Sequence, residues 1–228
     1  MQGELIRRFL IVVAGGTGTR MQSAVPKQFM PIGGIPILVH TLRQFHAWDK
    51  DLQLIVVMHA DWIGQWHELA QTHCPEIVHQ VVRGGQERFD SVKAGLACIA
   101  DQEAIVGIHD AVRPLVSKAT MQRCFDAAHR WGSAIPCVPV TDSIRMVVGS
   151  GSKHIDRAAL RAVQTPQCFS MDILQKAYQQ TYQSTFTDDA SVVEAAGFAV
   201  ELVEGNRENI KITNPEDILV AESLLLPR

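Results

Sequence analysis

Short apolar runs alternate along this chain with longer amphipathic stretches. The run Phe9–Ala14 is apolar throughout, and Leu52–His59 and Ala104–His109 are similar. Between such runs lie stretches with apolar residues at helical spacing, such as Ile37–Trp48 and Lys118–Trp131. Strands that alternate with helices predict a Rossmann-like α/β fold, a mostly parallel sheet with helices on both faces. Further strands are expected at Ile77–Val82, Ala134–Val140, Arg161–Phe169, Ala199–Val203 and Ile210–Thr213, and further helices at Asp61–His73, Glu87–Ala100, Met171–Tyr182, Asp188–Ala196 and Pro215–Leu226.

One segment, Thr141–Leu160, interrupts this alternation. It has strand-like runs on either side of a Gly-Ser-Gly-Ser turn and no helical pattern. This pattern predicts a hairpin arm that projects from the α/β body. Because a two-stranded hairpin is only marginally stable in water, we expect the arm to be buried against a second copy of the chain; the alternative is a mobile surface hairpin. We therefore predict one domain, residues 1–228, with an arm subdomain at about 141–160, and a homodimer.

Composition narrows the function classes. With 228 residues, 46% of them hydrophobic, the chain can bury a sizeable core. A net charge of -3 argues against a disordered or nucleic-acid-coating protein. The apolar runs are too short to span a bilayer, and no secretory signal is recognisable. Five cysteines without CxxC or metal-site spacing predict mainly core residues in a cytoplasmic protein, with neither nucleic acid nor membrane as a partner.

The first apolar run leads into the loop "AGGTGTRMQSAVPKQF", Ala14–Phe29. Ligands of open α/β sheets bind beyond the carboxyl ends of strands, and glycines there let backbone N–H groups approach phosphate oxygens. The spacing matches neither the P-loop nor the GxGxxG dinucleotide fingerprint. Arg20 and Lys27, seven residues apart, add two positive charges, which nucleotidyl transfer needs around its phosphorus. The alternative is a tight turn with two solvated charges.

This loop resembles the glycine-rich signature of nucleotidyltransferases that activate sugars and polyols. GxGxRM followed by PKQF is similar to the form found in the 2-C-methyl-D-erythritol 4-phosphate cytidylyltransferase family of the non-mevalonate isoprenoid pathway. Further blocks match that family in order, from the first strand to the last helix. They are "GGQERFDSV" (Gly84–Val92), "HDAVRP" (His109–Pro114), "PVTDSI" (Pro139–Ile144), "IDR" (Ile155–Arg157), "QTPQ" (Gln164–Gln167), "TDDAS" (Thr187–Ser191) and "EGNRENIKIT" (Glu204–Thr213).

The resemblance implies an enzyme that places CTP across the first glycine loop. The polyol phosphate would attack the α-phosphorus of CTP and release pyrophosphate, while Arg20 and Lys27 stabilise the transition state. Asp110 would lie near the ribose, a Mg²⁺ ion held mainly by the CTP phosphates, and the incoming substrate. The residues that the resemblance assigns to the nucleotide are Ala14, Gly15, Gly16, Gly18, Gly84, Gly85, Ser91 and Asp110.

A second set of residues is expected to recognise the polyol phosphate. Hydroxyl groups suit a polyol, and cations suit its phosphate. Arg157 lies on the arm, so the family's dimer implies that it reaches the partner's active site. Lys211 has two possible roles, one at the polyol phosphate and one at the CTP phosphates. The set comprises Arg113, Ser143, Arg157, Thr165, Thr187 and Lys211.

Two positions depart from the family pattern, and two other functions stay open. Gln86 follows the glycine pair where some relatives carry aspartate, which weakens the match to the base site, and Ser143 replaces a frequent threonine. A cytidylyltransferase acting on ribitol 5-phosphate would have closely related loops. A non-catalytic nucleotide-binding protein could share the fold, but it could dispense with Arg20, Lys27 or Asp110, which are all present.

Overall fold

The computed structural model describes residues 6–16 and 25–225, and within them the strands form an eight-stranded sheet. Its order is β10-β7-β11-β6-β1-β4-β5, with β12 also paired to β7. Pairs β1–β4, β1–β6, β4–β5 and β12–β7 are parallel, whereas β11 and β10 pair antiparallel. The strands are β1 Arg8–Ala14, β4 Gln53–Met58, β5 Gln80–Arg83, β6 Ile105–Asp110, β7 Ser133–Pro139, β10 Arg161–Val163, β11 Gln167–Ser170 and β12 Leu202–Glu204.

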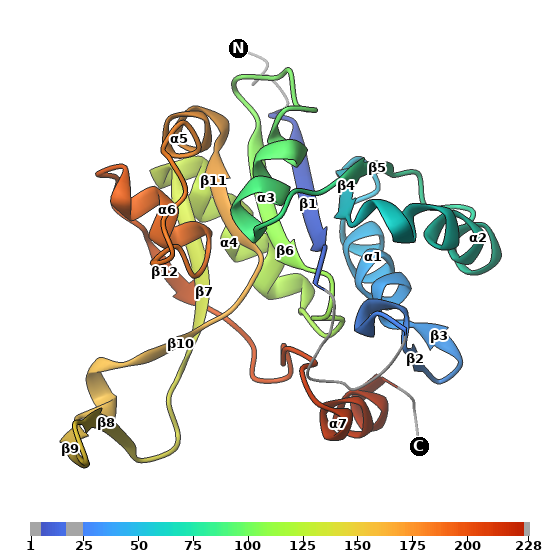
Figure 1. Cartoon of the computed structure of the whole chain (residues 1–228). Coiled ribbons are helices and arrows are strands. Elements are labelled where there is room, and N and C mark those ends of the chain that lie inside the picture. Colours follow the sequence, from blue (N-terminus) through green and yellow to red (C-terminus); the bar gives the residue numbers. More distant parts are fainter. Residues whose placement is uncertain (1–5, 17–24, 226–228) are drawn as a thin grey trace.

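Helices cover both faces of this sheet (Figure 1), as the sequence pattern predicted. Alternate residues of β1 serve the two faces: Leu10 and Val12 belong to one core cluster, and Ile11 to the other. None of the helices within the described ranges is long and apolar enough to cross a membrane. One face carries α1 Ile37–Trp48, α2 Ile63–His73 and α4 Lys118–Trp131, and the other α3 Arg88–Leu96, α5 Met171–Ala177 and α6 Asp189–Ala195.

A third, smaller cluster lies beyond the carboxyl edge of the sheet. There α7, Pro215–Leu225, packs through Ala221 against Ile32 and Ile212. Ile32 belongs to a short hairpin of β2, Pro31–Ile32, and β3, Ile35–Pro36, which the sequence analysis did not predict. Four of the five cysteines are buried, as predicted, and Cys98 is exposed.

Two of the predicted strands are wrong. The stretch Arg161–Phe169 is not one strand, because it leaves the sheet after β10 and returns as β11. The break contains a cis Thr165–Pro166 peptide, and Pro166 has no N–H to donate to a ladder. Residues Ile210–Thr213 form a loop instead of a strand, although the Ile212 N–H bonds to the Val112 carbonyl at 3.0 Å.

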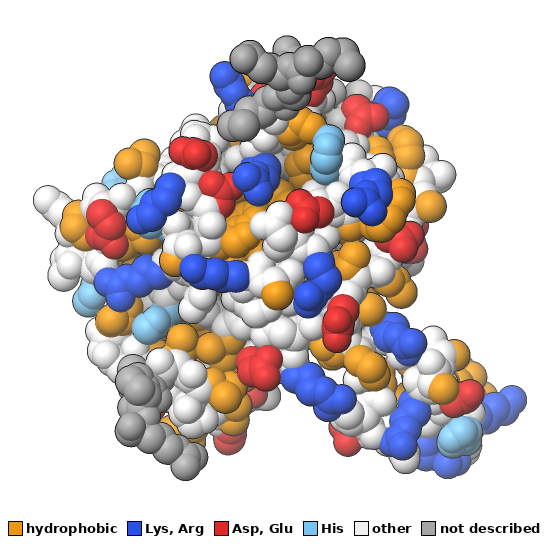
Figure 2. Space-filling view, turned by 180° about the vertical axis from the view of Figure 1, so that it is seen from behind, with side chains coloured by type: hydrophobic (Ala, Val, Ile, Leu, Met, Phe, Trp, Pro, Cys, Tyr) orange, Lys and Arg blue, Asp and Glu red, His pale blue; other side chains and the backbone are white. Residues whose placement is uncertain are grey.

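The predicted arm is present as a separate hairpin. Strands β8, Ile144–Val148, and β9, Gly151–Ile155, pair antiparallel with each other, and neither belongs to the main sheet. The arm stands clear of the body in Figures 1 and 2, with basic side chains beside hydrophobic ones. Val147, in β8, is 79% exposed. Its neighbours Met146 and Val148 are exposed as well, and a run of exposed apolar side chains is expected where another surface covers it.

Candidate active site

Three parallel strands end at the same edge of the sheet and bring the predicted nucleotide residues together. Val13 of β1 is in register with Asp110 of β6, and the Ala111 N–H bonds to the Val13 carbonyl. The Gly84 N–H bonds to the carbonyl of Met58, the last residue of β4. The chain winds outward from β1 through β4 to β5 and then returns to β6 on the other side of β1. Such a reversal leaves a crevice, which is where open α/β sheets bind ligands.

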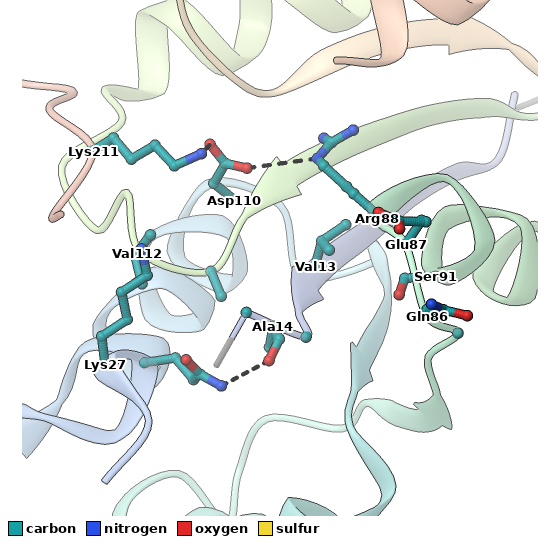
Figure 3. Close-up of a pocket in the computed structure, with 15 residues that line it drawn as sticks. Val13, Ala14, Lys27, Gln86, Glu87, Arg88, Ser91, Asp110, Val112 and Lys211 are labelled. Atoms are coloured by element: carbon teal, nitrogen blue, oxygen red, sulfur yellow. Dashed lines mark hydrogen bonds and ion pairs between the residues drawn. The ribbon is translucent and has the colours of Figure 1, made fainter. Parts of the chain in front are cut away.

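A cavity of about 320 Å³ occupies this crevice. In Figure 3, Lys27 and Lys211 lie on one side of it, and Ser91 and Gln86 lie on the other. Asp110 lies between Lys211 and Arg88. The side chains and main chain of β1, β6, the turn before α3 and the loop before α7 all contribute. The lining residues are Val13, Ala14, Gly15, Gly16, Lys27, Gln28, Gly85, Gln86, Glu87, Arg88, Ser91, Asp110, Ala111, Val112 and Lys211.

Packing explains the glycine pair before α3. A Cβ on Gly84 would lie 2.7 Å from the Ser91 hydroxyl oxygen, and one on Gly85 would lie 2.3 Å from Cβ of Asp90. The turn can therefore approach the helix only without side chains. Gly16 differs, since a Cβ there would meet nothing within 4 Å. Packing within the described chain does not require glycine at position 16, and an open backbone beside the cavity suits a bound phosphate.

A buried glutamine fixes the position of Lys27 next to β1. Lys27 begins the short 3-10 helix η2, Lys27–Phe29, directly after Pro26. Gln28 is 2% exposed, and its Nε2 donates to the Ala14 carbonyl at 2.7 Å. Phe29 stacks on Trp66 of α2 at a centroid distance of 6.1 Å. No role was predicted for Gln28, although its place beside Lys27 in the PKQF motif was a usable signal.

Asp110 is a buried carboxylate of the site with three positively charged side chains around it. It is 7% exposed, and its Oδ2 lies 3.1 Å from both Lys211 Nζ and Arg113 Nε. Its Oδ1 lies 4.0 Å from Arg88 Nε. Burial alone would raise the pKa of this carboxyl, but Lys211, Arg88 and Arg113 together hold it well below its usual range. Asp110 is therefore a carboxylate in any physiological buffer.

His109, the residue before Asp110, is a neutral histidine whose hydrogen bonds hold the end of β6 in place. Burial lowers the pKa of His109 to about 4. Its Nε2–H donates to the Arg113 carbonyl at 3.0 Å, so its Nδ1 accepts from the Thr165 hydroxyl at 2.9 Å. That hydroxyl also accepts from the Asp110 N–H at 3.1 Å. Arg113 Nη1 donates to the Asn209 carbonyl at 2.8 Å, which ties the loop before Lys211 to the same unit.

The structure thus brings together part of the predicted set. Among the described residues, Ser143, Arg157 and Thr187 do not line the cavity, and their roles stay predictions. Gly18 and Arg20 lie outside the described residues. Thr165 and Arg113 contact Asp110 from behind. Those found at the cavity wall are Ala14, Gly15, Gly16, Lys27, Gly85, Ser91, Asp110 and Lys211, with Gly84 next to Ser91.

Comparison with known proteins agrees with the geometry. The family model for 2-C-methyl-D-erythritol 4-phosphate cytidylyltransferase matches residues 9–226. A protein of that name from Bacteroides fragilis is 49% identical over 218 residues, which span 96% of this chain and 99% of the relative. One from Phocaeicola vulgatus is 44% identical over 220 residues, covering 96% and 100%.

This chain belongs to the 2-C-methyl-D-erythritol 4-phosphate cytidylyltransferase family. The crystal structure of such an enzyme from Thermus thermophilus has a TM-score of 0.75 at 31% identity, covering 96% of this chain and 98% of that one. A synthase structure from Anaerococcus prevotii has a TM-score of 0.82 at 24% identity, covers 96% of both chains and supports the fold. The family resemblance and the α/β fold with its separate hairpin are confirmed.

Proposed function

We propose that the cavity at the carboxyl edge of β1 and β6 is the active site of a cytidylyltransferase. Membership of the family makes the reaction the transfer of CMP from CTP to 2-C-methyl-D-erythritol 4-phosphate, a step of the non-mevalonate isoprenoid pathway that releases pyrophosphate. The observation that carries the assignment is the meeting of Lys27, Lys211 and Asp110 around one glycine-lined cavity. The ribitol 5-phosphate and non-catalytic alternatives have no comparable support.

The triphosphate of CTP would lie along the open backbone of Gly15 and Gly16. Lys27, fixed beside it by Gln28, would then face the α-phosphate, where negative charge builds up as the polyol phosphate attacks. Arg20, which lies outside the described residues, is proposed for the same phosphate group. The attacking atom is itself a phosphate oxygen, so the reaction needs no protein base to remove a proton. The chain contributes position and charge.

The pyrimidine would occupy the side of the cavity formed by the turn before α3. Ser91 is 3% exposed, and its hydroxyl lies between the backbones of Gly15 and Gly84. A buried hydroxyl at this position can read one edge of a base, because a buried polar group left without a partner is costly. Gln86 also lines the cavity and can both donate and accept hydrogen bonds. We assign base recognition to this wall.

Asp110 fits the role of a magnesium ligand. Magnesium in nucleotide enzymes is usually held by one or two carboxylates together with phosphate oxygens. Lys211 and Arg113 occupy the Oδ2 side of the carboxylate, whereas Oδ1 has Arg88 at the longer distance of 4.0 Å. Bound magnesium would offset part of the negative charge of the triphosphate. Lys211, beside Asp110, is placed to contact a phosphate of either substrate.

The polyol phosphate would be bound partly by the arm of a second copy of the chain. Ser143 and Arg157 are exposed and are not among the described residues that line the cavity of their own chain. The arm also exposes three consecutive apolar side chains, Met146, Val147 and Val148. The arm thus has exposed apolar side chains that a second chain would bury, and it carries candidate substrate residues. Both features support a dimer in which each arm completes the active site of the partner. Thr187 would add a hydroxyl from the body.

Pyrophosphate release tests this function directly. Purified protein is incubated with CTP and Mg²⁺ and with either 2-C-methyl-D-erythritol 4-phosphate or ribitol 5-phosphate, and UTP replaces CTP in parallel. We expect release with CTP and the methylerythritol phosphate, and far less with the other three combinations. Preferential release with ribitol 5-phosphate would overturn the substrate assignment. No release with any combination would overturn the enzyme assignment.

A further inference from the structure

A buried carboxylate holds one of the cations at the pocket wall. Arg88 Nη1 donates to Asp189 Oδ1 at 2.8 Å, and Nη2 donates to Oδ2 at 2.6 Å. Asp189 is 0% exposed, whereas the Arg88 side chain is 29% exposed and lines the cavity. The Tyr178 hydroxyl donates to the same Oδ1 at 2.7 Å. The three residues therefore form a chain from the core, between α5 and α6, to the cavity.

This chain leaves the guanidinium very little freedom. A bidentate contact fixes the plane of the guanidinium as well as its distance from the carboxylate. Burial would lower the pKa of Arg88, but the charge and hydrogen bonds of Asp189 raise it above its usual value. Burial, followed by the Asp189 charge, raises the pKa of Tyr178, which stays a protonated donor. Its ring stacks on Phe89 of α3 at 4.8 Å.

We propose that Asp189 and Tyr178 are positioning residues, which hold the positive charge of the Arg88 guanidinium 4.0 Å from Asp110 Oδ1 and so help to fix the Asp110 carboxylate for cytidylyl transfer. The inference rests on the proposed function of the cavity. Two cations, Lys211 and Arg113, lie on the Oδ2 side of the carboxylate, and within the described residues Arg88 is the cation that lies near Oδ1, at 4.0 Å. Without a fixed Arg88, Oδ1 would lose the positive charge that balances Lys211 and Arg113 on the Oδ2 side, and the orientation of the carboxylate would be less well defined.

Tyr178→Phe is the sharpest test, because it removes one hydroxyl and keeps the ring on Phe89. Tyr178 is 3% exposed and does not line the cavity among the described residues, so any kinetic effect must pass through Asp189 and Arg88. We expect kcat to fall about 3- to 10-fold, since small displacements of reacting groups are costly. The KM values for CTP and the polyol phosphate should change less than about twofold.

Gln180→Met serves as the matched control. Gln180 Nε2 donates to the Val192 carbonyl of α6 at 2.9 Å, so this variant also loosens the α5–α6 contact but does not touch Asp189. Both variants are expected to lower the melting temperature slightly, and only Tyr178→Phe should lower kcat. Equal kcat values for wild type, Tyr178→Phe and the control would overturn the positioning role, because a purely structural tyrosine would behave in this way.

A double-mutant cycle adds a second readout. In an Arg88→Lys background the bidentate contact is already lost, so adding Tyr178→Phe should lower kcat less than about 1.5-fold further. Additive losses would also overturn the proposal. Failure of the proposed function gives a different result, because the wild-type protein itself would then release no pyrophosphate. If the wild type is active and Tyr178→Phe leaves kcat unchanged, only the positioning role is overturned.

Discussion

The carboxyl edge of the sheet and the β8–β9 arm differ in the burial of their charged residues and in the partners that these residues have. At the edge, Asp110 is 7% exposed and has three cations around it, two of which, Arg88 and Arg113, are in turn held by other residues. On the arm, Arg145 and Arg157 are exposed and bond to atoms of the arm and its base. The edge is organised within one chain, whereas the arm has the features of a surface that a partner completes.

The largest loss of activity is expected when a cation at the carboxyl edge is removed. Lys27→Ala should lower kcat by about 10²- to 10³-fold, by analogy with the loss of a group that stabilises transition-state charge. CTP binding and the melting temperature should change little. Lys50→Ala, an exposed lysine at the opposite end of the sheet, is the control and should be fully active. A Lys27→Ala enzyme with normal kcat would remove Lys27 from the mechanism.

A smaller loss is expected from adding a methyl group to the turn before α3. In Gly85→Ala the new Cβ would lie 2.3 Å from Asp90 Cβ, so the turn has to move and the base wall is displaced. We expect kcat/KM for CTP to fall about 10- to 100-fold. Gly64→Ala in α2 is a matched change with no atom within 4 Å, and it should be neutral or slightly stabilising. Equal behaviour of the two variants in a steady-state assay would contradict the close approach.

The buried edge should also respond to acid. The pKa of His109 is about 4 in the folded chain, against an ordinary value of 6.5, so the unfolded chain binds more protons between these values. The contribution of His109 to the stability of the folded chain is complete above pH 6.5 and is lost as the pH falls toward 4. From pH 7 to pH 5 we expect the free energy of unfolding to drop by about 2 kcal/mol from this residue.

Urea denaturation at the two pH values measures this drop, with His109→Gln as the comparison. The Asp110 contribution stays constant in this range because its pKa is lowered, so it is lost only below the unfolded value. The variant should show a smaller pH dependence than the wild type by about 2 kcal/mol. Identical pH dependences would mean that His109 is already able to take up a proton in the folded protein.

The smallest effect is expected on the arm. Val147→Asp replaces the most exposed apolar side chain of β8 by a charge, and it should convert the proposed dimer to monomers in analytical ultracentrifugation. We expect kcat/KM for the polyol phosphate to fall about tenfold, the loss of one charge-assisted hydrogen bond from Arg157. Ser150→Asp, at the hairpin turn, is the charge-matched control. A Val147→Asp variant that is monomeric yet fully active would show that each chain contains a complete site.

Much of the fold could be predicted because local pattern and tertiary structure agree. The bounds of α1 and α4 match the expected helices, whose apolar faces are regular and whose ends are clear. The stretch Arg161–Phe169 could not be predicted correctly, since residues distant in sequence decide it. Just after β10, the Gln164 side chain donates to the Asn206 carbonyl at 2.9 Å. No local pattern contains that partner.

The site residues also divide into those that local motifs predict and those that depend on distant partners. Residues in glycine-rich or charged motifs, such as Lys27, Gly85 and Asp110, could be named from the sequence. Arg88 and Gln28 were missed, although both lie inside quoted motifs, because their roles depend on partners elsewhere. Arg88 needs Asp189, 101 residues away, and Gln28 needs the carbonyl of Ala14 across the loop.

A crystal structure of the protein with CTP and Mg²⁺ tests the central claim most directly. We predict that the triphosphate lies over Gly15 and Gly16, with the α-phosphate within hydrogen-bonding distance of Lys27 Nζ and the pyrimidine against Ser91. A triphosphate bound away from Lys27, or a base on the opposite wall of the cavity, would contradict the account of this site.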